Sequence, residues 1–439
     1  MFLPNLSFLP RFQLTLGTYL LVVLPLCLGP IIALVLFDFS TRRAERLEPK
    51  GCRKLGLRVK SNLADEFDKK YAEGAESGKD KSGNELWRVK SLWIYPVKSC
   101  RGIELNGANV ISTGMEHDRQ FCFAQLKSPF PVSADTPKSE KAAHKWEFLT
   151  QRMFPLLACV ETQIWIPDPS SATYSPTNAE VRSGGVLVMT YPYQEDGWRG
   201  TLGSFGAALR GTVPQKSFRI PLKPTPEQIK NNGYTTEEMI IWKDSPLALN
   251  MGVHVPPELK YFLGLRNPVT LFRVHDKNER EVFRCAPRKE QLGYQPITGF
   301  ADAYPLHILN LASVQDVARR LPEDAPKLSA RRFRPNIIIT GPSAYAEDFW
   351  KKIRIGYYSE HYVSCRTARC RLPNTDQFSG KKHPAEPDKT LKSFRRIDEG
   401  AATHACLGMQ MVPALKESKI RVGDAIEVLE SGDHYYLMQ

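Results

Sequence analysis

The sequence predicts a β-rich α+β fold preceded by one transmembrane helix. Residues 14–37 contain no charged side chain and are rich in Leu, Val and Ile. At a rise of about 1.5 Å per residue, such a run is long enough to cross about 30 Å of hydrocarbon. The rest of the chain breaks into short apolar runs, and its 33 Pro and 29 Gly indicate many turns between short strands.

Length, charge and cysteine content narrow the class of protein. A chain of 439 residues exceeds the usual size of one domain, so we expect two packed domains with appendages. The net charge of +13 favours an anionic partner such as nucleic acid, acidic lipid, a phosphorylated cofactor or an acidic protein. The nine cysteines lack the regular spacing of a disulfide scaffold, which indicates a reducing compartment.

The apolar run at the N-terminus predicts a retained membrane anchor over residues 14–37. It is too long for the core of a cleaved secretory signal, and no typical cleavage site follows it. Basic residues gather after the run, whereas only Arg11 precedes it, so the body is expected on the cytosolic side. Residues 38–83 are charged and poor in apolar side chains, which predicts a polar tether outside the core.

The folded body is expected to begin near residue 84. Residues 86–95, 120–125 and 336–340 are predicted strands, and the Ser-, Pro- and Lys-rich residues 127–145 are a predicted surface insertion. Ser313 and Asp316 have the spacing of a capping box, which predicts a short amphipathic helix. Two last strands are expected over residues 419–422 and 425–429, with a turn between them.

Two cysteines, Cys365 and Cys370, lie among arginines in the window most informative about chemistry. Nearby cations favour the thiolate, which could act as a nucleophile, a soft-metal ligand or half of a redox pair. Two structural cysteines beside surface arginines are an equally simple reading. A zinc site that also uses His361 and His404 is a weaker one, because the cysteine spacing is not typical of zinc.

Other cationic positions follow predicted strands or precede them. They are Lys98 with Ser99, Asp118 with Arg119, and Arg332 with Arg334. Each supplies donors suited to a phosphate, although a loop arginine is more often simply solvated. The sequence contains no Gly-rich phosphate loop, nucleophile elbow or zinc-protease motif. It also lacks a four-cysteine iron–sulfur set and a dinucleotide-binding fingerprint.

Taken in order, these windows resemble the MOSC domain family and, within it, the mitochondrial amidoxime-reducing components. The segments that carry the resemblance are residues 92–100, Asp118-Arg119, residues 333–337, residues 345–350, Arg369-Cys370 and residues 422–424. The resemblance implies an N-terminal MOSC β-domain over residues 84–273 and a MOSC β-barrel over residues 274–430, joined by strands near residues 87–123. The chain departs from the family pattern at Ala368 and around Tyr304.

The resemblance also implies a site. Cys370 would be the protein ligand to molybdenum in a molybdenum–molybdopterin cofactor. The cofactor-binding residues would be Lys98, Ser99, Arg119, Arg334, Asn336, Arg369 and Cys370. Several guanidinium groups around one phosphate would hold it by charge-assisted hydrogen bonds.

The implied activity is the two-electron reduction of N-hydroxylated compounds of the amidoxime type. Electrons would come from NADH through cytochrome b5 and its reductase, since the chain shows no flavin or iron–sulfur motif of its own. The implied address is the mitochondrial outer membrane, with the endoplasmic reticulum membrane as the alternative, and no nucleic-acid partner is expected. The alternative function is a sulfur or molybdenum-cofactor carrier that uses a persulfide on Cys370.

Overall fold

The computed structural model describes residues 16–46, 48–83, 85–131, 133–141, 143–209, 211–275 and 278–437. The chain divides into two units. One unit holds residues 1–48 and 192–217, with helices α1 (Leu16–Arg46) and α4 (Gly197–Leu209). The other unit holds residues 49–191 and 218–439 and contains most of the strands. The expected fold class, β-rich α+β, is confirmed.

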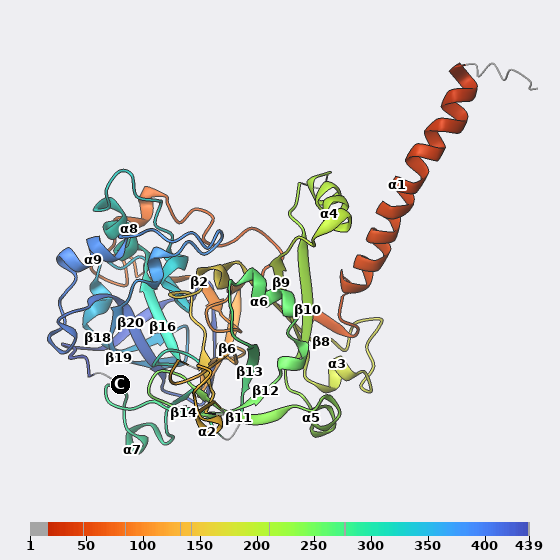
Figure 1. Cartoon of the computed structure of the whole chain (residues 1–439). Helices are drawn as coiled ribbons and strands as arrows, with labels where there is room; N and C mark the ends of the chain where they lie inside the picture. The colour runs from red at the N-terminus through yellow and green to blue at the C-terminus, as the bar shows by residue number, and fades with distance from the viewer. Residues whose placement is uncertain are drawn as a thin grey trace, which may run out of the picture. The chain divides into compact units, whose positions relative to one another are not determined.

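An eight-stranded sheet forms the larger part of the second unit. Its strands are, in spatial order, β22 (Ile426–Ser431), β18 (Trp350–Ile355), β19 (Ser359–Arg369), β20 (Ala405–Pro413), β16 (Leu306–Asn310), β17 (Ile337–Thr340), β2 (Arg88–Ile94) and β3 (Ile103–Leu105). Only β16 and β17 pair in parallel; the other pairs described are antiparallel. Helices α8 (Leu311–Arg319) and α9 (Asp388–Phe394) contribute Leu311 and Leu391 to a core with Leu309 and Ile338 of the sheet (Figure 1).

A closed five-stranded barrel adjoins this sheet. It consists of β11 (Thr235–Ile240), β12 (Leu247–Asn250), β13 (Val269–Val274), β6 (Phe121–Lys127) and β7 (Lys145–Phe148). The closed barrel is therefore built largely from the predicted N-terminal domain, whereas the strands expected to form a MOSC barrel make the eight-stranded sheet. The expectation that strands near residues 87–123 join the later half is confirmed for β2 and β3, because β2 pairs with β17 and β3 with β2, but not for β6, which belongs to the closed barrel.

The remaining strands form three smaller sheets. They are β1 (Cys52–Lys54), β8 (Glu161–Pro167), β9 (Val186–Pro192) and β10 (Gln215–Pro221); β21 (Glu417–Arg421), β4 (Gly107–Ile111) and β5 (Gly114–Met115); and β14 (Arg280–Glu281) with β15 (Ile297–Thr298). Five short helices lie between strands. They are α2 (Lys138–Lys141), α3 (Ala179–Arg182), α5 (Pro226–Asn232), α6 (Pro257–Phe262) and α7 (Lys289–Leu292).

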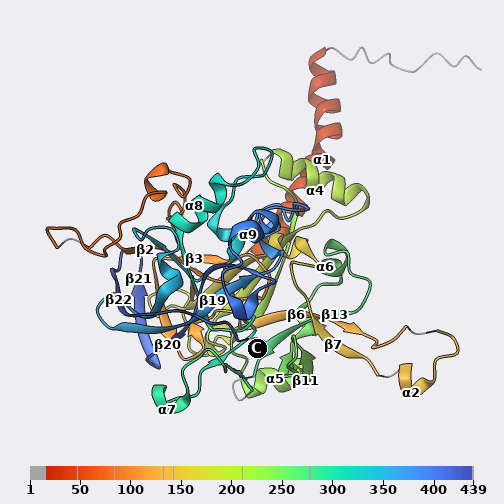
Figure 2. The ribbon, with the colours of Figure 1, turned by 90° about the vertical axis from the view of Figure 1, so that its left-hand side faces the viewer.

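Several local predictions meet a definite outcome. Residues 127–145 extend from the body between β6 and β7 (Figure 2), which confirms the predicted surface insertion. The predicted helix forms, but its cap is Asn310, whose side chain accepts from the Ala312 N–H at 3.1 Å. Ser313 instead donates to the buried Glu347 at 2.8 Å. The two last strands belong to different sheets, because β21 pairs with β4 and β22 with β18.

The prediction that residues 38–83 lie outside the core was wrong for the part after residue 48. Leu63 is 2% exposed and packs in the core beneath α8. Glu66 is also buried and accepts hydrogen bonds from Ser329 and from the Ala330 N–H. A few well-placed residues therefore dock a segment whose composition is otherwise polar.

The predicted helix at the N-terminus is present as α1, which contains Pro25 and Pro30 and continues into the charged residues that end at Arg46. The first two residues of the expected anchor lie outside the described part of the chain. Among the described residues, no helix combines the length and the apolar character that crossing a membrane requires. The predicted membrane anchor over residues 14–37 is therefore not supported.

Candidate functional site

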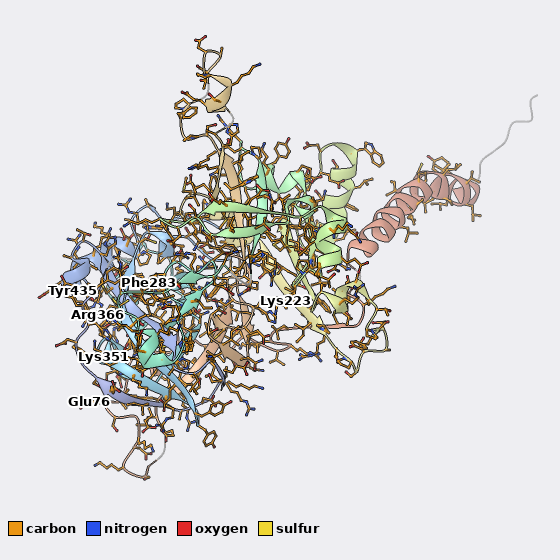
Figure 3. The ribbon with its side chains drawn as sticks, turned by 90° about the horizontal axis from the view of Figure 1, so that it is seen from below. Glu76, Lys223, Phe283, Lys351, Arg366 and Tyr435 are labelled. Carbon is orange, nitrogen blue, oxygen red and sulfur yellow. The ribbon has the colours of Figure 1, made fainter. Side chains whose placement is uncertain are left out.

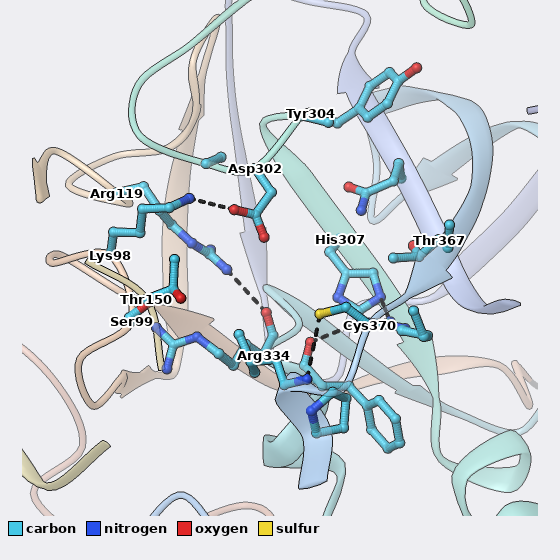
Figure 4. A pocket seen from close by; sticks show the side chains of 18 of the residues that line it. Lys98, Ser99, Arg119, Thr150, Asp302, Tyr304, His307, Arg334, Thr367 and Cys370 are labelled. Atoms are coloured by element: carbon cyan, nitrogen blue, oxygen red, sulfur yellow. Dashed lines mark hydrogen bonds and ion pairs between the residues drawn. The ribbon is translucent and has the colours of Figure 1, made fainter. Parts of the chain in front are cut away.

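A cavity of about 200 Å³ is lined by residues from both the eight-stranded sheet and the closed barrel with their loops. All seven predicted site residues line it: Lys98, Ser99, Arg119, Arg334, Asn336, Arg369 and Cys370. They come from the loop after β2, the segment before β6, the loop before β17 and the end of β19 (Figure 4). Positions far apart in the sequence thus meet in one place.

Cys370 follows the last residue of β19 and is half-buried at the cavity wall. Its Sγ accepts a hydrogen bond from the Leu372 backbone N–H at 3.5 Å. Cys365, by contrast, is fully buried in a separate cluster with Val282 and Val412. The structure thus brings only one of the two cysteines in the window to the cavity.

Two guanidinium groups converge on the ring of Tyr95. The central carbon of Arg334 lies 4.2 Å from the ring centroid, and that of Arg119 lies 4.4 Å from it. Arg119 donates to Asp118 at 2.6 Å and to the Arg334 carbonyl oxygen at 3.1 Å, which fixes the two arginines relative to each other. The site therefore concentrates positive charge on one wall of the cavity.

Arg334 has donor capacity that its surroundings do not use. Its side chain is buried, Nη1 donates to Gln377 at 3.1 Å, and Nη2 has no hydrogen-bond partner among the described residues. Burial without enough counter-charge lowers the pKa of Arg334 to about 10. An anion in the cavity would satisfy both the donor and the charge.

Three of the predicted site residues have left-handed backbone conformations. The φ angle is 67° at Ser99, 48° at Arg119 and 52° at Arg334. Such angles are uncommon for residues other than glycine and cluster at functional sites. They direct these side chains out of tight turns at the cavity wall.

Lys98 is buried and already has protein partners. Its Nζ donates to the Phe300 carbonyl oxygen at 2.8 Å and pairs with Asp302 (Figure 4). Desolvation lowers the pKa of Lys98. Desolvation raises the pKa of Asp302, but the Lys98 ammonium outweighs it, so the carboxyl pKa falls below its ordinary value. The pair places one ionised carboxylate on an otherwise cationic cavity.

Arg369 and Asn336 have polar atoms that the fold already uses. Arg369 donates to the carbonyl oxygens of Leu407 at 2.8 Å and Phe333 at 3.3 Å, and it contacts His307. Asn336 accepts from the His307 N–H and donates to the Trp93 carbonyl oxygen, both at 3.1 Å. We therefore assign both side chains a structural role, because their hydrogen bonds connect the ends of neighbouring strands at the cavity wall.

The approach of these strands depends on a glycine. Gly408 of β20 has a φ of 72°, and a Cβ added there would lie 2.6 Å from Nε2 of His307. Burial, and then the Arg369 charge, lower the pKa of His307 well below its usual range, so this imidazole is neutral. A neutral ring can accept from the guanidinium beside it.

Comparison with known proteins identifies the fold. The MOSC domain model matches residues 296–427, and the MOSC N-terminal beta barrel domain model matches residues 86–196. The chain belongs to the MOSC domain family. The N-terminal match includes β2, β6 and β7, and the C-terminal match includes β16 to β20, so the cavity draws on both matched regions.

Curated relatives cover most of the chain at modest identity. Mitochondrial amidoxime-reducing component 1 of Mus musculus is 24% identical over 79% of this chain and 83% of its own length. The Homo sapiens protein of the same name is 25% identical over 72% of this chain and 74% of its own length. Molybdenum cofactor sulfurase of Arabidopsis thaliana is 23% identical over 77% of this chain, which corresponds to only 35% of that protein.

Several further residues line the cavity of this MOSC protein, although no sequence pattern singled them out as site residues. They are Thr150, Arg152, His307, Thr367 and Tyr436. Thr367 Oγ1 is buried and has no hydrogen-bond partner among the described residues. Thr367 lines the same cavity as its neighbour Ala368, the position where the chain departs from the family pattern (Figure 4). Arg152 lies 4.4 Å from the ring centroid of Trp242, whose indole N–H donates to Asp302 at 3.3 Å.

The zinc reading is not supported. Among the described residues, which include all nine cysteines, no group of three or more His, Cys, Asp or Glu side chains is placed to hold a metal ion. His361 is buried and hydrogen bonds to Ser359 at 2.9 Å. Of the two cysteines in the window, Cys370 is the one that lies at the cationic cavity.

Proposed function

We propose that this MOSC protein is a molybdenum-cofactor oxidoreductase that reduces N-hydroxylated compounds of the amidoxime type. The observation that carries the proposal is one cavity in which the Cys370 thiol faces a cationic wall. That wall holds a buried guanidinium nitrogen, Arg334 Nη2, and a buried hydroxyl, Thr367 Oγ1, which lack partners among the described residues. Such groups fit a cofactor that offers a soft metal, a phosphate and a polar ring system.

The residues divide into groups that would bind the cofactor and groups that would support them. Cys370 would supply the thiolate ligand, and Arg334 and Arg119 would hold the phosphate. Ser99 and Thr367 would donate to or accept from the remaining polar atoms. When bound, the cofactor supplies the two-electron chemistry that cleaves the N–O bond and releases water.

Side chains of this chain would orient the substrate. Asp302 is ionised, and its side chain is 60% exposed at the cavity. It can accept hydrogen bonds from the N–H groups of an amidine-like compound. Trp242 and Arg152 flank the carboxylate and supply a flat, partly apolar face. The Lys98 ammonium keeps the carboxylate charged, so the pocket would discriminate in favour of substrates with donor groups.

Cytochrome b5 and its NADH-dependent reductase are the proposed electron donors. The net charge of +13 supports an encounter with an acidic haem protein, since complementary charge speeds association. We also propose a mitochondrial location, because the amidoxime-reducing relatives are named as mitochondrial. Protease added to intact mitochondria tests whether the body faces the cytosol: digestion of the body is expected, and protection until the outer membrane is ruptured contradicts this placement.

Reconstitution tests the reaction. The purified full chain, loaded with molybdenum and pterin, should oxidise NADH in the presence of cytochrome b5, its reductase and benzamidoxime, and should form benzamidine. Omitting any one component should stop the reaction. Loaded protein that reduces no N-hydroxylated compound but carries a transferable persulfide on Cys370 would replace this proposal with the sulfur-carrier function.

A further inference from the structure

Cys365, which the proposed function does not use, has a thiol partner elsewhere in the chain. Cys285, from the loop between β14 and α7, lies close enough to Cys365 for each thiol to shift the pKa of the other. Cys285 packs against the buried cluster that contains Cys365, Tyr304 and Val412. Cys285 is half-buried, whereas Cys365 is fully buried. The pair thus has one sulfur open to small solutes and one shielded from them.

Cys285 also contacts the C-terminal segment on both sides of Tyr436. Its thiol donates to the Tyr435 carbonyl oxygen at 3.6 Å, and its sulfur lies 3.2 Å from the donating Leu437 N–H. Figure 3 shows Phe283, Tyr435 and Arg366, which neighbour these groups along the chain, in the same part of the molecule. The sulfur therefore holds the segment by one donated and one accepted hydrogen bond.

The electrostatics favour reaction at Cys285. The hydrogen bond from Cys365 and the Leu437 N–H lower the pKa of the Cys285 thiol to about 6, against the opposing effect of desolvation. Desolvation raises the pKa of Cys365 well above its ordinary value. A thiolate next to a protonated thiol is the arrangement in which one sulfur attacks an oxidant and the other resolves the product.

We propose that Cys285 and Cys365 form a dithiol pair that peroxides oxidise reversibly to a disulfide, and that this oxidation shifts the cavity wall at Tyr436. The Cys285 thiolate attacks one peroxide oxygen, which gives a sulfenic acid and releases hydroxide. The Cys365 thiol then attacks the sulfenic sulfur, and water leaves as the S–S bond forms. A dithiol reductant returns both sulfurs to thiols by exchange.

The link to the cavity runs through contacts of the same segment. Tyr304, which belongs to the cluster that Cys285 packs against, and Tyr436 both line the cavity. The Tyr436 N–H donates to Asp398 at 2.8 Å, and Asp398 pairs with Arg366 of β19. A disulfide draws Cys285 toward Cys365 and weakens the hydrogen bond that its sulfur accepts from the Leu437 N–H. The backbone beside Tyr436 then loses its attachment to Cys285, while the Tyr436 N–H still donates to Asp398.

Thiol mapping of the full chain tests the pair. Brief exposure to a small excess of hydrogen peroxide should lower the mass by two hydrogens and yield a cross-linked peptide containing Cys285 and Cys365, and dithiothreitol should reverse both changes. Cys285→Ser should abolish the cross-link without disturbing the buried Cys365, whereas Cys159→Ser, which changes a buried cysteine at the end of the short helix before β8, should leave it intact. Stable addition of oxygen to Cys285 without a cross-link, or a cross-link to another cysteine, would overturn the pair.

A second measurement tests the link to the cavity without relying on the reductase activity. Oxidised and reduced proteins are compared for the rise in melting temperature that inorganic phosphate produces. We expect a smaller rise in the oxidised form, and the same rise in oxidised and reduced Cys285→Ser. An unchanged phosphate effect in protein shown to contain the disulfide would overturn the link.

Discussion

Two buried arginines, Arg334 and Arg332, should differ in how much stability the protein loses when each is replaced by Met. For Arg334→Met, the lowered pKa of Arg334, from 12.5 to about 10, corresponds to about 3 kcal/mol of unfavourable desolvation that the substitution removes. The substitution also removes one charge-assisted hydrogen bond, worth about 1.5–3 kcal/mol, and a cation–π contact worth about 0.5–2 kcal/mol. These contributions nearly cancel, so the cofactor-free protein should change little in stability.

Arg332 is a matched control two residues away. It is also buried, it lines the same cavity, and its Nε has no partner among the described residues. Its terminal nitrogens, however, donate to the carbonyl oxygens of Pro373 and Asn374 at 3.3 Å and pair with Asp376 at 3.2 Å. Arg332→Met leaves the Pro373 carbonyl oxygen without this donor, whereas the Asn374 carbonyl oxygen keeps the His383 N–H and Asp376 is partly exposed to water. Urea unfolding should therefore show a loss of about 1–3 kcal/mol.

Phosphate titration completes the comparison between the two variants. Inorganic phosphate should raise the melting temperature of the unmodified protein, because a ligand that binds the native state stabilises it. The rise should largely disappear in Arg334→Met and persist in folded Arg332→Met. The inference that Arg334 binds an anion would be refuted if both variants were equally destabilised and phosphate still raised the melting temperature of Arg334→Met as it does that of the unmodified protein.

Three further changes test the site and the fold. Cys370→Ser should leave the unfolding transition in place but abolish amidoxime reduction per mole of folded protein, because a hydroxyl is a poor soft-metal ligand; full activity would exclude Cys370 as the ligand. Burial raises the pKa of Glu347 from 4.5 to about 7. The stabilisation that this protonated carboxyl contributes is therefore fully present below pH 4.5 and is lost as pH rises through 7. Between pH 5 and 8 the free energy of unfolding, measured by urea titration, should fall by up to about 3 kcal/mol more in the unmodified protein than in Glu347→Gln. The same pH dependence in both proteins would contradict this. Leu63→Ala should cost about 2–4 kcal/mol, whereas Val59→Ala, at a position that is 75% exposed, should cost under about 0.5 kcal/mol.

The sequence predicted best those features that depend on local patterns. Alternating or continuous apolar runs located β2, β6 and β17, and the ordered motifs brought together the seven residues that line the cavity. The docking of residues 49–83 was missed, because Leu63 and Glu66 are two contacts in a polar segment. The cap at Asn310 was missed because Ser313 has the same local pattern but is used by Glu347.

The distinction between residues that would bind and residues that support required tertiary structure. Arg334 and Arg369 are both arginines at the cavity. Arg334 has a nitrogen without a hydrogen-bond partner among the described residues, whereas Arg369 donates to the carbonyl oxygens of Leu407 and Phe333. Their partners come from positions far away along the chain, so no local pattern separates them. The position of Cys285, rather than Cys370, against the cluster that contains Cys365 likewise depends on a loop that follows a different sheet.

The left-handed backbone at Ser99, Arg119 and Arg334 has a consequence for how such a protein can be engineered. Glycine tolerates these angles, whereas a residue with a Cβ is disfavoured there by roughly 1 kcal/mol. Selection for thermal stability alone, in a library that includes glycine, should therefore drift toward glycine at these three positions and erase the side chains that face the cavity. A thermostable variant that keeps all three would have to gain its stability elsewhere, for example in the surface segment between β6 and β7.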